Sequence, residues 1–236
     1  MTAFAHLVQN DVRTLYRTGY VWVSIAVFAL MLLIAMQASN LDFAGYEQFV
    51  AAIILFDAAL SPVMLVGLMV LLERSEGAFA ALSVSPMPTW AYLAARVLVV
   101  SLFSLAQMLL LVLAVYDASY SPTALTAGLA GAACISGLFG FLLVSFFDDL
   151  YAFLLPMIGA IMLLGVPGYA VLLGIPQKWL FWHPTSGPMA LIEKAFALDA
   201  RQGLFTAVAT TLVWAAVAAI LAHLAIGRMQ ARIGGS

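Results

Sequence analysis

The chain has 236 residues, of which 65% are hydrophobic and only 8% are charged, and its formal net charge is −2. A soluble domain carries roughly 25% charged residues, so this composition excludes a water-soluble protein, and the mean hydropathy of +1.10 indicates a surface that lies mostly in lipid. The small net charge does not favour a nucleic-acid partner, and the single cysteine excludes an intramolecular disulfide and a cysteine metal cluster.

A helix that precedes the first hydrophobic stretch is predicted over residues 4–17. Apolar side chains recur there at helical spacing and polar side chains occupy the remaining face, which is typical of a helix that lies in the membrane interface. The apolar positions are Phe4, Leu7, Val8, Val12, Leu15 and Tyr16, and the polar positions are Asn10, Asp11, Arg13 and Thr14.

Six hydrophobic stretches follow, each long enough to cross a bilayer. A hydrocarbon core of about 30 Å requires about 20 apolar residues in a helix. The connections are short, and no segment has the composition of a water-soluble domain or a long linker. The sequence therefore predicts an all-α membrane protein that forms a single domain over residues 1–236. The predicted spans are residues 21–37, 49–72, 90–115, 123–147, 150–173 and 204–226.

The basic residues predict the orientation of these spans, because cytoplasmic flanks retain Lys and Arg. An even number of spans places both termini on one side of the membrane. With that side in the cytoplasm, six arginines are cytoplasmic and three basic residues are outside. The first group is Arg13, Arg17, Arg74, Arg96, Arg228 and Arg232, and the second is Lys178, Lys194 and Arg201. We therefore expect cytoplasmic termini.

The connection at residues 73–89 is the only sizeable predicted cytoplasmic loop. A charged cluster closes the second span, Gly77 permits a tight turn, and residues 78–84 can form a short helix that Pro86 and Pro88 stop. One interpretation is an ordinary loop between spans. The other is a rigid projection that docks into a cytosolic protein.

The outer segment at residues 174–202 contains three prolines and the aromatic cluster Trp179, Phe181 and Trp182. Aromatic side chains of this kind lie at the headgroup level. The segment is therefore predicted to re-enter the outer leaflet, with a short helix near residues 188–196.

The chain lacks a phosphate-binding loop, which requires a glycine-rich turn that ends in Lys followed by Ser or Thr. Its two lysines, Lys178 and Lys194, follow Gln177 and Glu193. Any energy from ATP must therefore come from another polypeptide.

The order of these features resembles the type-2 (ABC-2) family of ABC exporter permeases, which includes small drug and antibiotic export permeases such as the fluoroquinolone export permeases. An acid-Arg-x-x-Gly sequence at residues 73–77 is followed by the short apolar helix, Ser85-Pro86, the aromatic Trp90 and then Arg96. The interfacial helix, the six spans and the proline-containing outer segment extend the resemblance over nearly the whole chain.

The resemblance implies a permease subunit of the bacterial plasma membrane that exports a hydrophobic or amphipathic substrate, such as a drug, an antibiotic or a lipid-like molecule. Two permeases would pair, as identical or sister chains, among the membrane lipids. Two cytosolic ABC ATPase subunits would hold ATP and Mg²⁺, so this chain would need no cofactor and would not be an enzyme by itself.

The resemblance also implies three sets of site residues. The coupling segment would sit in a groove of the ATPase, the second and fifth spans would line the substrate path at the dimer axis, and the outer segment would close the exit. The coupling set is Glu73, Arg74, Glu76, Gly77, Phe79, Leu82, Val84 and Pro86. The path set is Phe56, Asp57, Ser61, Met64, Met157 and Met162, and the outer gate is His183 and Pro184.

Asp57 is the one acid deep within a predicted span, about 12 Å from the outer end at about 1.5 Å per residue. A charge at that depth costs at least about 2.5–3.5 kcal/mol, so a function is the default hypothesis. It could attract a cationic substrate or change its protonation during transport. The alternative is a structural, hydrogen-bonded Asp57, just as the methionines of the path can be packing residues.

Two other classes of protein compete with an exporter. Ser136-Gly137 in the fourth span and His223 in the sixth are similar to the serine and histidine of rhomboid intramembrane proteases. However, Cys134 stands where that family has Gly, and the first outer loop is too short. An ion-coupled secondary transporter using Asp57 is the third class, but the sequence has no inverted repeat and no matching pair of broken spans.

Overall fold

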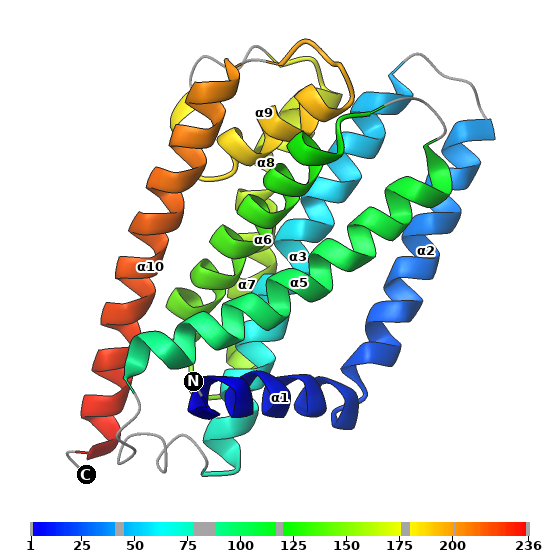
Figure 1. Cartoon of the computed structure of the whole chain (residues 1–236). Helices are drawn as coiled ribbons and strands as arrows, with labels where there is room; N and C mark the ends of the chain where they lie inside the picture. Colours follow the sequence, from blue (N-terminus) through cyan, green and yellow to red (C-terminus); the bar gives the residue numbers. More distant parts are fainter. Residues whose placement is uncertain are drawn as a thin grey trace.

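The computed structural model describes residues 2–40, 45–77, 88–116, 120–175, 180–200 and 202–234, and the regular structure in these ranges is helical. The predicted all-α fold class is confirmed. The helices, drawn in Figure 1, are α1 (Thr2–Arg17), α2 (Tyr20–Asn40), α3 (Tyr46–Ser75), α5 (Thr89–Val115), α6 (Pro122–Val144), α7 (Leu150–Leu164), α8 (Val166–Leu172), the 3-10 helix η1 (Leu180–Trp182), α9 (Ser186–Ala195) and α10 (Leu204–Gly234).

Five of these helices are long and apolar enough to cross a membrane, namely α2, α3, α5, α6 and α10. They coincide with the first four and the last of the predicted spans. The fifth predicted span is not one continuous helix. It is the pair α7 and α8, which is bent by 50° at a short break.

The break follows from the local sequence. Pro167 has no backbone N–H and cannot bond to the Leu163 carbonyl one turn earlier, so the hydrogen-bond ladder is interrupted. At the same level the Thr185 hydroxyl donates to the Leu164 carbonyl at 2.6 Å. A neighbouring segment thus satisfies a backbone carbonyl at the break, which is how broken helices persist in membranes.

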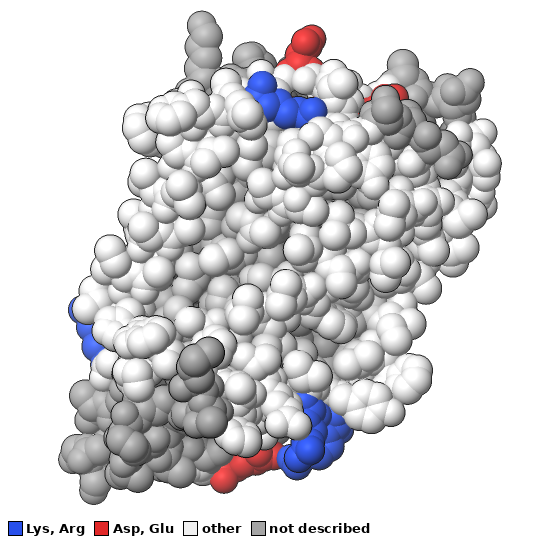
Figure 2. Space-filling model, viewed as in Figure 1, with Lys and Arg blue, Asp and Glu red and all other residues white. Residues whose placement is uncertain are grey.

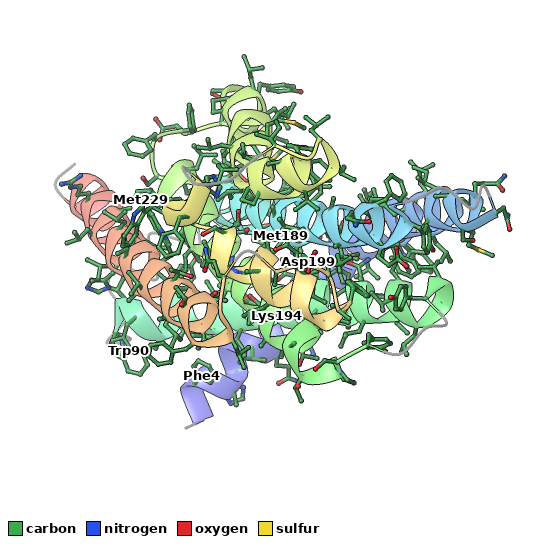
Figure 3. All side chains as sticks on the ribbon, turned by 90° about the horizontal axis from the view of Figure 1, so that it is seen from above. Phe4, Trp90, Met189, Lys194, Asp199 and Met229 are labelled. Carbon is green, nitrogen blue, oxygen red and sulfur yellow. The ribbon has the colours of Figure 1, made fainter. Side chains whose placement is uncertain are left out.

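Helix α3 lies at the centre of the bundle. Of its most apolar 18-residue window 72% is buried, compared with 17% for α2 and 22% for α10. Seen from above, α3 runs between α5 and the α7–α8 pair (Figure 3). Small residues allow the close approach of α6, because a Cβ on Gly140 would lie 3.1 Å from Val63 Cα.

Both termini lie at the same end of the bundle, which we call the terminal end (Figure 1). Helix α1 runs across this end, at a large angle to the long helices. Figure 2 shows that the visible charged side chains gather toward the two ends of the molecule and leave an uncharged band between them. Such a band is suited to the hydrocarbon core of a bilayer.

The buried face of α1 differs from the predicted apolar face. Val12 and Tyr16 are exposed, at 54% and 66%, whereas Asp11 is only 2% exposed. Leu15 is buried, as expected. The assignment of Asp11 to the polar outer face was therefore wrong, and its reason is a buried arginine on α5 that the next subsection describes.

The contact of Gly67 on α3 with Phe153 on α7 generates a packing prediction. A Cβ on Gly67 would lie 2.2 Å from Phe153 Cζ, so Gly67→Ala forces the ring to move. We expect a loss of about 1–3 kcal/mol in the free energy of unfolding, measured by thermal unfolding in detergent, and recovery when Phe153→Leu is added.

Gly159→Ala on α7 is the matched control, because a Cβ at Gly159 meets no atom within 4 Å. It should be neutral or slightly stabilising, since Ala has the higher helix propensity. Equal losses for the two glycine variants would contradict the packing role of Gly67.

Candidate functional site

A buried ionic cluster ties three helices together at the terminal end. It consists of Asp11 on α1, Glu73 on α3, and Tyr92 and Arg96 on α5. The Arg96 side chain donates from Nε to Asp11 Oδ2 at 3.0 Å and from Nη2 to Asp11 Oδ1 at 2.8 Å. Nη2 also donates to Glu73 Oε1. Two parallel bonds to one carboxylate fix the orientation of both partners.

Tyr92 completes the ionic cluster. Its hydroxyl donates to Glu73 Oε2 at 2.5 Å, and Arg96 Cζ lies 5.2 Å from the centre of its ring. The ring also makes an edge contact with Phe141 of α6, at 5.9 Å between centroids. The aromatic face therefore adds a cation–π contact and joins the cluster to the hydrophobic core.

The electrostatics of the ionic cluster depend on burial. Arg96 is 1% exposed. Desolvation raises the pKa of Asp11, and the charge and hydrogen bonds of Arg96 act in the opposite direction. A buried charge without its partner costs several kcal/mol, so the three charged groups must stay together. Helix α1 therefore cannot leave the bundle without exposing or isolating Asp11.

The described residues of the predicted coupling set have different environments. Glu73 faces inward to Arg96, rather than outward to a partner. Arg74 donates to the Phe147 carbonyl at 2.6 Å, Glu76 pairs with Arg17 at 3.6 Å on the exposed surface, and Gly77 has a φ of 73°. This left-handed conformation favours glycine and agrees with the predicted turn. Phe79, Leu82, Val84 and Pro86 lie outside the described residues.

Asp57 and Ser61 of the predicted path lie in the interior of α3. Asp57 is 3% exposed, and the Ser61 hydroxyl lies 3.2 and 3.3 Å from its two carboxylate oxygens. None of the ion pairs among the described residues involves Asp57. A buried carboxyl with one weakly placed hydroxyl is incompletely satisfied, which is unusual for a purely structural group.

The other path candidates are not gathered around Asp57. The ring of Phe56 packs against Tyr169 of α8, with centroids 6.1 Å apart, and Met64 is half-buried on α3. Met157 faces the core, whereas Met162 on the same helix is 45% exposed. The structure thus places the two methionines in different environments.

The outer gate candidates lie beside the break between α7 and α8. His183 and Pro184 line a small pocket of about 190 Å³ together with Leu163 and side chains of α6. Burial lowers the pKa of His183, and the Leu163 carbonyl partly offsets this effect. Nδ1 lies 3.1 Å from the Thr185 hydroxyl. The segment at residues 183–185 therefore contacts the carbonyls of both Leu163 and Leu164 at the break.

Ser136 and His223 do not form a catalytic pair. The Ser136 hydroxyl is buried and makes no hydrogen bond within the described part of the chain, while His223 is exposed on α10. A nucleophilic serine requires a base within hydrogen-bond reach, so nothing in this geometry favours a protease.

The ionic cluster was not predicted from the sequence, although Arg96 gives one local signal for it. Arg96 lies six residues inside the predicted third span, where a charge requires a partner or a function. Its pairing with Asp11 and Glu73 could not be predicted, because contacts across 85 and 23 residues depend on the packing of the helices.

The ionic cluster leads to a test of stability. Arg96→Met leaves two acids beside apolar side chains, and we expect it to reduce the free energy of unfolding by about 3–5 kcal/mol. Adding Asp11→Asn and Glu73→Gln should restore part of this loss, because the isolated charges are then gone. Thermal unfolding in detergent measures the stability of the single and the combined variants. If the combined variant loses the sum of the separate losses, the groups are not coupled.

The chain matches the family model described as ABC-2 family transporter protein over residues 17–226. Comparison with individually curated proteins gives no significant match. The matched region begins at the end of α1 and includes every candidate membrane span through Ile226 of α10. Because the match covers most of the chain and agrees with the helical bundle, this protein belongs to the ABC-2 family of transporter membrane proteins.

Proposed function

We propose that this chain is the permease subunit of an ATP-driven exporter that moves a hydrophobic or amphipathic substrate out of the cytoplasm or the inner leaflet. The observation that carries the proposal is the family match over residues 17–226. The apolar band between two charged ends supports a membrane path for such a substrate (Figure 2).

Coupling to a separate ATPase takes place at the terminal end. Glu73 lies in the last turn of α3, immediately before the segment that carries Phe79, and it is held by Arg96 of α5. Arg96 in turn holds Asp11 of α1. A force applied to the segment at residues 76–88 therefore reaches three helices through one ionic cluster. ATP and Mg²⁺ belong to the partner ATPase.

Pairing with a second permease, identical or a sister chain, is part of the proposal. Helix α2 exposes large apolar side chains on several sides, among them Trp22, Leu30 and Leu33, and only 17% of its apolar window is buried. In the assembled exporter, this surface is shared between lipid and the second chain.

The terminal end faces the cytoplasm of a bacterium, and the chain lies in the plasma membrane. Arg13, Arg17 and Arg74 are all on α1 or at the last turn of α3, which is the arrangement that cytoplasmic flanks favour. His183 and Pro184 then belong to the outer segment, and their position beside the bent α7–α8 pair suits an outer gate.

Phe79→Asp tests the coupling assignment. An apolar anchor in a protein groove is the usual energetic centre of an interface, and its loss costs roughly 2 kcal/mol or more. We expect the variant to insert normally but to lose association with the cognate ATPase in a pull-down and to lose substrate-stimulated ATP hydrolysis.

His6→Asp is the matched control, because His6 is exposed on α1 at the same end of the molecule. It adds the same charge at a position outside the predicted coupling segment and should leave both readouts unchanged. A Phe79→Asp variant with full ATPase association and stimulation would overturn the coupling assignment.

Asp57→Asn tests the role of the buried acid. We expect transport of cationic substrates to fall and the pH dependence of transport to change, because Asn cannot carry the charge that Asp57 can. Vesicle uptake at several pH values measures this, with Asp199→Asn, which neutralises an exposed acid outside the predicted spans, as the control. Identical transport at every pH would make Asp57 a structural residue.

A further inference from the structure

The outer face of α1 differs in charge from the face that packs on the bundle. Asp11 and Leu15 are buried, so the only acid of α1 is withdrawn into the ionic cluster. Arg13 and Arg17 are exposed, and because they are four residues apart their side chains are neighbours on one side of the helix. The described surface of α1 thus carries two arginine charges and no negative charge.

An apolar row lies beside these arginines. Val12 and Tyr16 are 54% and 66% exposed, and they are also four residues apart. Because successive residues of a helix are turned by about 100°, the row of Val12 and Tyr16 runs alongside the row of Arg13 and Arg17. Apolar and basic rows side by side on one exposed helix suit the boundary between acyl chains and headgroups.

The chain places this surface at the level of the headgroups. Helix α1 ends at Arg17, Gly19 turns the chain with a φ of 74°, and α2 begins at Tyr20. Trp22 and Val23 are then 63% and 53% exposed, in a helix that is long and apolar enough to span a bilayer. A tryptophan at the start of a span lies at headgroup level, so the end of α1 is at that level too.

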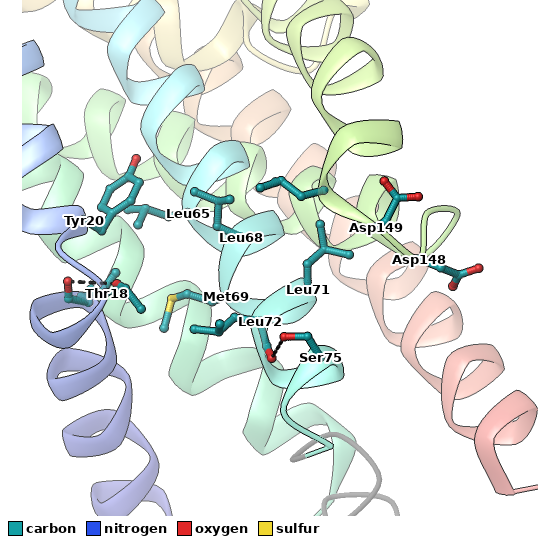
Figure 4. Close-up of a pocket in the computed structure, with 12 residues that line it drawn as sticks. Thr18, Tyr20, Leu65, Leu68, Met69, Leu71, Leu72, Ser75, Asp148 and Asp149 are labelled. Carbon is teal, nitrogen blue, oxygen red and sulfur yellow. Dashed lines mark hydrogen bonds between the residues drawn. The ribbon is translucent and has the colours of Figure 1, made fainter.

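The other side of the α1–α2 corner faces the bundle. Leu15, Thr18 and Tyr20 line a pocket of about 440 Å³ at the terminal end, beside the last turns of α3 (Figure 4). The Thr18 hydroxyl donates to the Thr14 carbonyl at 2.8 Å, which satisfies one of the last carbonyls of α1. The orientation of α1 is therefore set by contacts on its inner side, and Arg13 is directed out of the bundle.

The two arginines differ in their ion pairs. Arg17 Nη2 lies 3.6 Å from Glu76 Oε1, and the two side chains are 74% and 49% exposed, so water weakens this pair. None of the ion pairs within the described residues involves Arg13. Arg13 can therefore bind an anion outside the bundle, and Arg17 is shared between that anion and Glu76.

We infer that the outer face of α1 binds an anionic phospholipid, with the lipid phosphate between Arg13 and Arg17 and the acyl chains along Val12 and Tyr16. A guanidinium donates to phosphate oxygens through a fork of N–H groups, and basic segments near a membrane surface attract anionic lipids. An acidic protein segment would satisfy the charges, but it would leave the apolar row without an apolar partner. The inference depends neither on ATP hydrolysis nor on the exported substrate.

The experiment uses the full chain in nanodiscs that contain equal amounts of phosphatidylglycerol and phosphatidylcholine with identical acyl chains. The photoreactive residue p-benzoylphenylalanine replaces Tyr16, and mass spectrometry identifies the lipid to which it crosslinks. We expect at least about threefold more crosslinking to phosphatidylglycerol, because two arginines attract its charge. Equal crosslinking to the two lipids would overturn the inference and would indicate that the arginines serve an acidic protein segment instead.

Loss of the arginines tests which residues hold the phosphate. Arg13→Gln combined with Arg17→Gln should abolish the preference for phosphatidylglycerol. Lys194→Gln, which removes a positive charge on α9 at the opposite end, is the control and should leave the preference unchanged. A preference that survives the loss of both arginines would overturn the inference.

Removal of an acid tests whether Glu76 competes with the lipid for Arg17. Glu76→Gln should raise the preference for phosphatidylglycerol, because Arg17 is then available to the phosphate alone. Asp148→Asn is the matched control, since Asp148 is an exposed acid at the same end that approaches Arg74 instead. Equal responses of the two variants would contradict a site that includes Arg17.

Inorganic phosphate separates a lipid site from a site for free phosphate. The lipid is also held by its acyl chains, so millimolar phosphate at constant ionic strength should leave the crosslinking ratio unchanged. Loss of the preference under these conditions would overturn the lipid assignment. The ATPase is absent from all of these measurements, so their failure is distinct from a failure of the proposed export function.

Discussion

The architecture of the terminal end depends on one buried cation. Arg96 is removed from water inside a bundle whose other interior groups are largely apolar, and such a group is tolerated only when its charge and donors are met. Asp11 and Glu73 meet them from two other helices. This requirement holds α1 across the end of the bundle and keeps the last turn of α3 against α5.

The opposite end uses hydrogen bonds rather than charges. Pro167 interrupts the fifth span, and the segment around Thr185 supplies donors at the carbonyls of the break. Helix α9 then packs between α6 and α10, where Gly128 and Gly187 leave room for its backbone. The two ends thus solve the same problem, polar groups inside an apolar bundle, by different means.

Much of this fold could be predicted from the sequence, because the length and hydropathy of a span are local properties. The five long helices, the helix over residues 4–17 and the turn at Gly77 are of this kind. The bend at Pro167 was missed, although proline gives a local signal for it. Asp11 shows the limit of prediction from sequence more clearly. The residue spacing of α1 permits Asp11 on either the exposed or the buried face, and only its ion pair with Arg96 on α5 places it inside. The family resemblance indicated the right class of transporter. The pocket at the terminal end could not be predicted, because the segments that line it are distant in sequence and meet only in the folded bundle.

The packing of the Phe153 ring against Gly67 also constrains how the fifth span can move. The ring occupies a space that exists only where α3 lacks a side chain, and the buried residues Val63 and Val70 lie one turn from Gly67 on either side. A gradual slide of α7 along α3 would drive the ring into those valines. Because Phe153 lies in the first turn of α7, the contact instead fixes the start of that helix against α3.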